Sequence, residues 1–214
     1  MKSTYINRRF YYKDKNGIRL PAVTTILKAT QPIESKVALS NWRKKVGNTQ
    51  ANRIASTGRR RAELLHRWVK EYLQGFSPVA SSLIQPYCYS LQSFLGKLSD
   101  IQLVDTVVPN YVEKYAGKVD LVARYQSIPF TIELMTAEQP KRGVDELYDK
   151  PLEIVAYNAA INRCYGESLF GSKVVNSLIV VALRDRDAQT FPFERQQLLN
   201  YWQKWLKRLN CFVE

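Results

Sequence analysis

The chain has 214 residues, 45% of them hydrophobic and 24% charged, so it can build one sizeable core and is not expected to be disordered. It has no apolar run of the roughly 18 residues that a membrane span needs, and its first residues lack the apolar segment of a secretory signal. Three scattered cysteines and one histidine exclude a disulfide framework, a zinc ribbon and a histidine-rich metal site. We expect an intracellular protein, in the cytoplasm or nucleoid or in an organelle matrix, with buried free thiols. Any catalytic metal would be an oxygen-ligated ion such as Mg²⁺ or Mn²⁺.

The net charge of +13 is confined to the first 80 residues. They hold 17 Lys and Arg against 4 Asp and Glu, whereas residues 81–214 hold 15 of each. A neutral body with a cationic lobe favours a polyanionic partner, because neutralised phosphates release counterions. Membrane surfaces and acidic proteins are competing partners, and nucleic acid is the favoured one.

The first part of the chain is predicted to contain a hairpin and then helices. Aromatic and basic residues alternate over 5–20 around an Asn16-Gly17 turn, which is typical of a β-hairpin. Residues 21–32 then form a short extended stretch or one helical turn. An amphipathic helix follows over 34–46, with Trp42 on its apolar side.

The clearest helix is predicted for residues 56–75. Ser56 or Thr57 caps it and Gly75 ends it. Its apolar face is defined by helical spacing and consists of Ala62, Leu65, Val69, Tyr72 and Leu73. Another helix covers roughly residues 80–98, with Pro86 near its first turns.

The hydrophobic period changes after this point. Strands are expected at 101–109, 117–125 and 129–135, then a helix over 145–166, a strand over 176–185 and a helix over 194–210. This last helix buries Leu198, Trp202, Trp205 and Leu209. The order predicts one α/β or α+β domain over 1–214 with a mixed sheet flanked by helices.

Two carboxylates stand out on the predicted strands. If residues 118–125 and 130–135 pair as a hairpin about 126–129, Asp120 lies near Glu133 and Met135. Like charges so close on apolar strands repel each other, and a divalent cation between them would relieve that cost. The alternative is that both acids lie on a solvated face of the sheet without a function.

Two groups on the 56–75 helix allow a structural and a functional interpretation. His66 lies beside the apolar stripe. It is either a core histidine, or it binds a metal itself or orients another metal ligand. Arg59, Arg60 and Arg61 stand near the predicted start of the helix, where cations are unfavourable beside the positive end of the helix dipole. An anion would offset that cost; otherwise they form a solvated charge run.

The segment KPLEIVAY places Lys150, Glu153 and Tyr157 on one helical face. The simple interpretation is an exposed polar seam with a partly buried tyrosine. This pattern alone indicates no function.

Taken in order, these motifs resemble those of the RecB-like branch of the PD-(D/E)XK nucleases, in particular the group of mitochondrial genome maintenance exonuclease and its bacterial relatives. The matching segments are PAVTTIL, RAELLHRWVKEYL, GKVDLVARY, TIELMTAEQP, KPLEIVAYNAAIN and SLIVVALRD. The resemblance runs from about residue 20 to the C-terminal YWQKWLKRL, and the order of motifs is more specific than any one of them.

The resemblance implies a restriction-endonuclease-like core and an activity. Asp120 and Glu133 would bind one or two Mg²⁺ or Mn²⁺ ions that activate water for attack on a phosphodiester, with His66 contributing to the metal site. Lys150, Glu153 and Tyr157 would help to place the nucleic acid. Residues 1–100 would form a basic hairpin and a helical arch for single-stranded DNA ends, and residues 101–214 the catalytic core.

Three positions depart from the family pattern. Met135 occupies the position of the catalytic lysine, and methionine can neither donate a hydrogen bond nor carry charge. Ala62 replaces a glycine and Glu153 a glutamine. Another lysine could supply the missing amine, and the candidates are Lys118, Lys141 and Lys150.

We therefore expect a metal-dependent DNA exonuclease acting on single-stranded DNA, with Asp120, Glu133, His66 and position 135 in the active site. Arg59, Arg60 and Arg61 would bind nucleic acid. The alternative is a catalytically impaired descendant that binds nucleic acid within a larger complex. The sequence identifies no protein partner, and we expect no membrane partner.

Overall fold

Five strands form the central sheet of the computed structural model, which describes residues 1–213. Their order is β4-β5-β6-β7-β8, and neighbouring strands are antiparallel except β6 and β7, which are parallel. The bounds are β4 (Leu98–Asn110), β5 (Tyr115–Tyr125), β6 (Ile128–Ala137), β7 (Asn176–Leu183) and β8 (Arg186–Phe193). This confirms the predicted α+β class with a mixed sheet.

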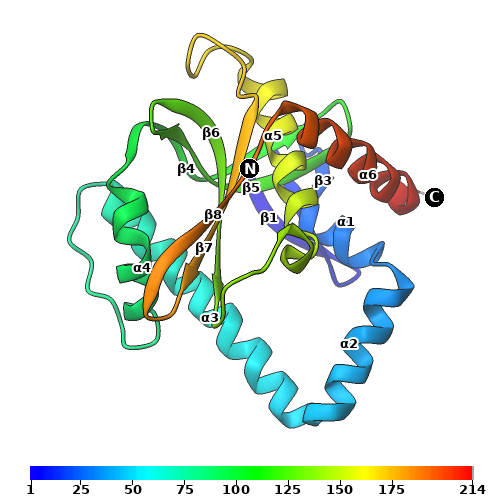
Figure 1. Cartoon of the computed structure of the whole chain (residues 1–214). Helices are drawn as coiled ribbons and strands as arrows, with labels where there is room; N and C mark the ends of the chain where they lie inside the picture. The colour runs from blue at the N-terminus through cyan, green and yellow to red at the C-terminus, as the bar shows by residue number, and fades with distance from the viewer. Residues whose placement is uncertain (214) are drawn as a thin grey trace.

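Helices cover both faces of the sheet (Figure 1). One face packs against α3 (Asn48–Leu73) and α4 (Gln85–Leu95). The other packs against α1 (Val23–Ala29), α5 (Lys150–Tyr165) and α6 (Arg195–Val213). Because strand side chains alternate, Leu121 and Ala123 of β5 point toward α3 and α4, whereas Val122 points toward the opposite core. Helix α5 also provides the crossover that the parallel pair β6 and β7 requires.

The N-terminal residues form a small antiparallel sheet of β1 (Lys2–Ile6), β2 (Arg9–Lys13) and β3 (Arg19–Pro21). The predicted hairpin about Asn16-Gly17 is confirmed, since it joins β2 to β3. Strand β1 was not predicted, because its turn uses Asn7 and Arg8, both at positive φ, without a glycine to mark it. A bridge between Ala22 and Ala116 connects this sheet to β5.

An arm, defined here as residues 33–60, projects from the sheet (Figure 1). It consists of α2 (Ile33–Val46) and the first half of α3, which meet at Gly47 with φ of 83°. The predicted helix over 34–46 is confirmed, but its apolar side is not buried. Trp42 is 37% exposed and no residue of α2 is buried, because α2 is contacted mainly by α3.

Helix α3 begins eight residues before the predicted cap. Ser56 and Thr57 lie inside the helix, so the prediction of a cap there was wrong: residues 48–55 contain no breaker, and α3 simply continues through them. Its end near Gly75, at φ of 87°, is confirmed. Leu65 and Val69 of the predicted face are buried, but Tyr72 is 41% exposed and Trp68 is buried, so the buried face is rotated from the predicted one toward Trp68.

Further boundaries differ for local reasons. Helix α4 begins at Gln85, where Pro86 fits the first turn, and α5 begins at Lys150 after a separate 3₁₀ turn, Val144–Leu147. Strand β8 was missed because it is a polar edge strand with one buried residue.

Of the cysteines, Cys88 is buried, whereas the other two are exposed, which corrects the expectation for Cys164 and Cys211. In the described part of the chain, no helix has the length and apolarity to cross a bilayer.

Candidate active site

The site lies where two neighbouring strands separate. The ladder of β5 and β6 runs from Tyr125↔Ile128 to Leu121↔Ile132. Beyond that point β5 continues to pair with β4, and β6 continues to pair with β7. The next residues along the two strands are Asp120 and Glu133. The Leu134 N–H donates to Asp120 Oδ2 at 2.8 Å, so this carboxylate sits in the fork between the strands.

The hairpin turn fixes which residues meet in the fork. Gln126 and Ser127 both have positive φ, which gives a two-residue turn and sets the register of β5 against β6. A slip of one residue would move both acids to the opposite face of the sheet. The predicted hairpin about 126–129 is therefore confirmed, with its turn at Gln126-Ser127.

Both acids are buried, and their protonation preferences differ. Asp120 is 8% and Glu133 4% exposed. Burial raises the pKa of Asp120, but the attraction of His66 and the Leu134 N–H outweigh burial and hold it below its usual range. Burial, and then the charge of Asp120, raise the pKa of Glu133 to about 8. Near neutral pH the metal-free site therefore favours one charged and one protonated carboxyl group.

His66 of α3 orients Asp120. Its Nδ1 lies 3.1 Å from Asp120 Oδ1. Burial lowers the pKa of His66, but the charge of Asp120 and the hydrogen bond to it dominate and raise the pKa to about 9. The imidazole thus donates from Nδ1 to the carboxylate. This geometry corresponds to the orienting alternative, and direct metal ligation by His66 remains a prediction.

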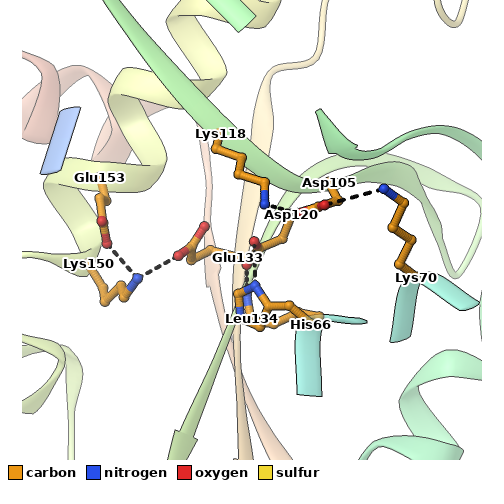
Figure 2. Close-up of polar contacts among 9 residues, drawn as sticks. All are labelled: His66, Lys70, Asp105, Lys118, Asp120, Glu133, Leu134, Lys150 and Glu153. Carbon is orange, nitrogen blue, oxygen red and sulfur yellow. Dashed lines mark hydrogen bonds and ion pairs between the residues drawn. The ribbon is translucent and has the colours of Figure 1, made fainter. Parts of the chain in front are cut away.

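Lys150, the first residue of α5, contacts the second acid. Its Nζ lies 2.5 Å from Glu133 Oε1 and 2.6 Å from Glu153 Oε2 (Figure 2). Burial lowers the pKa of Lys150, but the two carboxylates raise it well above its usual range. Glu153 is only 7% exposed, so the predicted alternative of an exposed polar seam is wrong.

Two further lysines lie on the other side of the acids (Figure 2). Lys118 Nζ is 2.6 Å from Asp105 Oδ1, and Lys70 Nζ is 3.4 Å from Asp105 Oδ2. Lys70 follows His66 by four residues on α3, so the helix directs both side chains to one side. The sequence interpretation missed Lys70 and Asp105. The spacing to His66 was a signal for Lys70, whereas Asp105, at φ of 49°, gave none.

Tyr157 of α5 is buried against β5, and it explains a glycine. A Cβ added to Gly117 would overlap two carbons of the Tyr157 ring, so this strand position accepts only glycine beside the tyrosine. The close approach seats α5 on β5 three residues before Asp120. Tyr157 supports the site by packing, and nucleic-acid contact by Tyr157 remains a prediction.

The arginine run divides between two environments. Arg61 is bound by Glu138, donates to Tyr87 Oη at 2.8 Å and to Thr136 Oγ1 at 3.0 Å, and so anchors α3 to the sheet. Arg59 and Arg60 are exposed on the arm. All three lie in the interior of α3, so the predicted position beside the positive end of the helix dipole was wrong.

Met135 and Lys150 line the same cavity. This cavity of about 400 Å³ is bounded by α1, the segment 147–149, Met135, Lys150 and Glu153. Met135 is partly buried and packs on the core beneath α5. Met135 and the side chain of Lys150 therefore border the same space.

The donor set agrees with a hard divalent cation. Asp120 and Glu133 provide carboxylate oxygens, which Mg²⁺ and Mn²⁺ prefer. Glu133 Oε2 is buried without a hydrogen-bond partner, and such an acceptor is costly unless a cation or water satisfies it. Within residues 1–213, no three His, Cys, Asp or Glu side chains form a preassembled metal cluster. Water or substrate oxygens would therefore complete the coordination.

The chain is similar over most of its length to mitochondrial genome maintenance exonuclease 1 of several species. It is 30% identical to the Mus musculus protein over 203 residues, which cover 91% of this chain and 59% of that protein. The Homo sapiens protein is 28% identical, with 91% and 58% covered, and the Xenopus tropicalis protein is 28% identical, with 89% and 56% covered. No family model matches the chain. The similarity confirms the resemblance that the motifs predicted, although this chain spans less than two thirds of these relatives.

Proposed function

We propose that this chain is a metal-dependent DNA exonuclease that hydrolyses phosphodiester bonds at single-stranded ends. The observation that carries the proposal is the fork between β5 and β6, which brings Asp120 and Glu133 together and leaves Glu133 Oε2 without a partner. The similarity to genome maintenance exonucleases over 91% of the chain supports the same conclusion. By the same similarity, we propose a role in DNA maintenance inside the cell or an organelle.

Asp120 and Glu133 would hold the Mg²⁺ or Mn²⁺. A divalent cation bound there supplies positive charge to the phosphate and lowers the pKa of a water molecule. The chain contributes the fixed positions of the acids. His66 and the Leu134 N–H each engage one oxygen of Asp120, so this carboxylate is held in one orientation before a cation arrives.

Metal binding can be tested without measuring nuclease activity. A cation that binds only the folded state stabilises it, by about 2.7 kcal/mol at a hundredfold excess over Kd. In a chain of this size that corresponds to roughly 5–10 °C in Tm. We expect Mn²⁺ to raise the Tm of the wild type, and Asp120→Asn to remove most of the increase. Equal stabilisation of both proteins would place the metal elsewhere.

The arm would bind the nucleic acid. It carries seven Lys and Arg and one Asp or Glu, and its exposed Trp42 offers a surface on which bases can stack. Arg59 and Arg60 extend this charge toward the sheet. We propose that the arm selects single strands, because the flat ring of Trp42 can stack on a base only where the base is unpaired. This division assigns affinity to the N-terminal region and chemistry to the sheet.

Met135 favours a second function. Its thioether cannot replace a lysine ammonium beside the phosphate, which would suit a descendant that binds nucleic acid within a larger complex and does not cleave it. This alternative keeps the arm and the metal-binding acids. It differs from the first proposal only in the rate of cleavage.

The experiment that separates the two is cleavage of end-labelled DNA with Mn²⁺. Single-stranded, double-stranded and internally blocked substrates are compared, with Glu133→Ala as the control. An exonuclease shortens single strands progressively from an end, and Glu133→Ala abolishes this. Binding to single-stranded DNA without any shortening, by a protein that Mn²⁺ stabilises, would support the binding-only alternative.

A further inference from the structure

We propose that Lys150 supplies the positive charge at the scissile phosphate that Met135 cannot, and that Glu153 holds its ammonium in place. The proposal rests on the nuclease function proposed above. It assigns to the first residue of α5 a task that is normally expected of the strand carrying the second acid. The structural basis is the contact of one ammonium with Glu133 and Glu153 at the cavity that Met135 lines.

The position of the ammonium is the first argument. Nζ of Lys150 lies 2.5 Å from Glu133 Oε1, while Met135 is two residues after Glu133 on the same face of β6. Met135, Lys150 and Glu153 line one cavity of about 400 Å³. An amine from α5 thus reaches the surroundings of Glu133 from the wall opposite the strand. A lysine at position 135 would approach the same space from the other side.

The other candidate lysines are engaged elsewhere. Lys118 contacts Asp105 at 2.6 Å. Lys141 lies over the Tyr148 ring, 5.8 Å from its centroid, in the segment after β6. Of the three lysines that the sequence offered, only Lys150 contacts one of the two acids of the fork.

Glu153 accounts for how the ammonium is held. It lies one turn after Lys150 on α5, and its Oε2 is 2.6 Å from Nζ. A glutamine at this position could accept a hydrogen bond but could not balance the charge. Because both side chains are largely enclosed, a charged partner lowers the cost of keeping an ammonium there. The departures at positions 135 and 153 are therefore linked through Lys150.

The chemical step is hydrolysis of a phosphodiester. A water oxygen forms the new P–O bond, the bond from phosphorus to the leaving sugar oxygen breaks, and that oxygen keeps the electron pair. The proton lost by the water and the proton gained by the leaving oxygen are exchanged with solvent. Lys150 stays protonated throughout, and its charge offsets the negative charge that develops on the phosphate oxygens.

The test exchanges the two side chains. Lys150→Met, Met135→Lys and the double variant are compared with the wild type, and Lys141→Ala is the control lysine. We expect Lys150→Met to lower kcat on single-stranded DNA with Mn²⁺ by about 10²–10³-fold with little change in KM. The double variant should recover at least about tenfold over Lys150→Met, because the charge returns from the strand. Lys141→Ala should match the wild type.

A second readout does not depend on turnover. Removal of the ammonium leaves Glu133 free to bind a cation, so the Mn²⁺-induced rise in Tm should be at least as large in Lys150→Met as in the wild type. Lys150→Gln, which keeps a donor without the charge, should lose activity in the same way, and the metal-free Tm of each variant shows that it is folded.

A folded Lys150→Met protein with unchanged kcat overturns the proposal and leaves the nuclease function standing. If neither the wild type nor Met135→Lys cleaves any DNA, the nuclease function fails and this proposal fails with it. If only Met135→Lys cleaves, Lys150 does not have the role.

Discussion

The arm and the sheet handle charge in opposite ways. On the arm, six of the seven Lys and Arg side chains are exposed and only one acid is present. The ion pairs of the described residues all lie outside residues 33–60. In the fork, the buried carboxyl groups of Asp120, Glu133 and Glu153 are each engaged by His66 or Lys150, whose side chains are partly buried. Exposed cations attract a polyanion over a distance, whereas enclosed, oriented groups act on one bond. Affinity and chemistry should therefore be separable by mutation.

The largest expected effect is on the sheet side. Asp120→Asn removes a carboxylate charge from the fork but preserves the shape of the side chain. We expect cleavage of single-stranded DNA to fall by at least about 10³-fold, since the cation loses a ligand. Binding to the same DNA in Ca²⁺ should change less than about threefold, because phosphate contacts on the arm supply the affinity. The measurements are initial rates and fluorescence anisotropy.

The control for this variant is Asp187→Asn, which neutralises an exposed acid on β8. It should leave both rate and affinity unchanged. A large loss of binding in Asp120→Asn alone would show that the two regions are not separable.

A smaller effect tests how α5 is seated on the sheet. Gly117→Ala places a Cβ into the Tyr157 ring, and overpacking of this kind costs about 1–3 kcal/mol. We expect a fall in Tm of several degrees, with reduced activity because Lys150 and Glu153 lie at the start of the same helix. Tyr157→Leu combined with Gly117→Ala should recover part of the Tm. Gly143→Ala serves as the matched control, since a Cβ there meets no atom within 4 Å. A Gly117→Ala protein as stable as this control would contradict the packing argument.

The arm is tested by removing exposed charge. Arg59→Ala combined with Arg60→Ala should weaken binding to single-stranded DNA by roughly tenfold and flatten its salt dependence, because fewer counterions are released. At saturating DNA, kcat should stay within about twofold. Arg61 is omitted because it anchors α3 to Glu138 and Thr136, so its loss would also affect folding.

The matched control removes two cations of α6, Lys204→Ala with Lys207→Ala, which lie outside the arm. If this pair weakens binding as much as the arm pair does, the nucleic acid is attracted by net charge alone. If kcat falls when Arg59 and Arg60 are both replaced by alanine, the arm takes part in chemistry.

The sequence predicted the proximity of Asp120 and Glu133 better than it predicted the arm. The fork could be foreseen because strand alternation and a two-residue turn place Asp120 and Glu133 on one face. The contacts of Lys150 could not, because they depend on the angle at which α5 crosses the sheet. The close packing of Tyr157 against Gly117 is part of how α5 sits on the sheet, and local periodicity does not encode it.

The arm shows where pattern alone misleads. The residues around Trp42 have the spacing of an amphipathic helix, yet no residue of α2 is buried in this structure. Helical periodicity predicts that a helix forms, and only tertiary contacts decide whether its apolar side is covered. The length of α3 was underestimated for a related reason, since a possible cap at Ser56 is also a tolerated interior residue.

The last prediction concerns how the stability of the metal-free protein depends on pH. The pKa of Glu133 is raised to about 8 and that of His66 to about 9, so both groups bind protons more tightly when the protein is folded. Their contributions to stability are fully present below their usual pKa values of 4.5 and 6.5 and are lost as pH rises through the raised values. The lowered pKa of Asp120 acts only in acid, and the raised pKa of Lys150 only in strong base. The charge of Lys150 lowers the pKa of Glu133 and that of Glu153 raises it, but burial and Asp120 dominate.

The metal-free Tm should therefore fall between pH 5.5 and 8.5. Glu133→Gln keeps a neutral side chain at every pH, so its Tm should fall less over the same range, whereas Asp187→Asn should follow the wild type. With saturating Mn²⁺ the trend should reverse, because the cation competes with the protons on the acids and binds more tightly as pH rises. Parallel Tm profiles of the wild type and Glu133→Gln would mean that the fork does not favour a protonated Glu133. The fork would then carry more negative charge than the burial of its two carboxyl groups suggests.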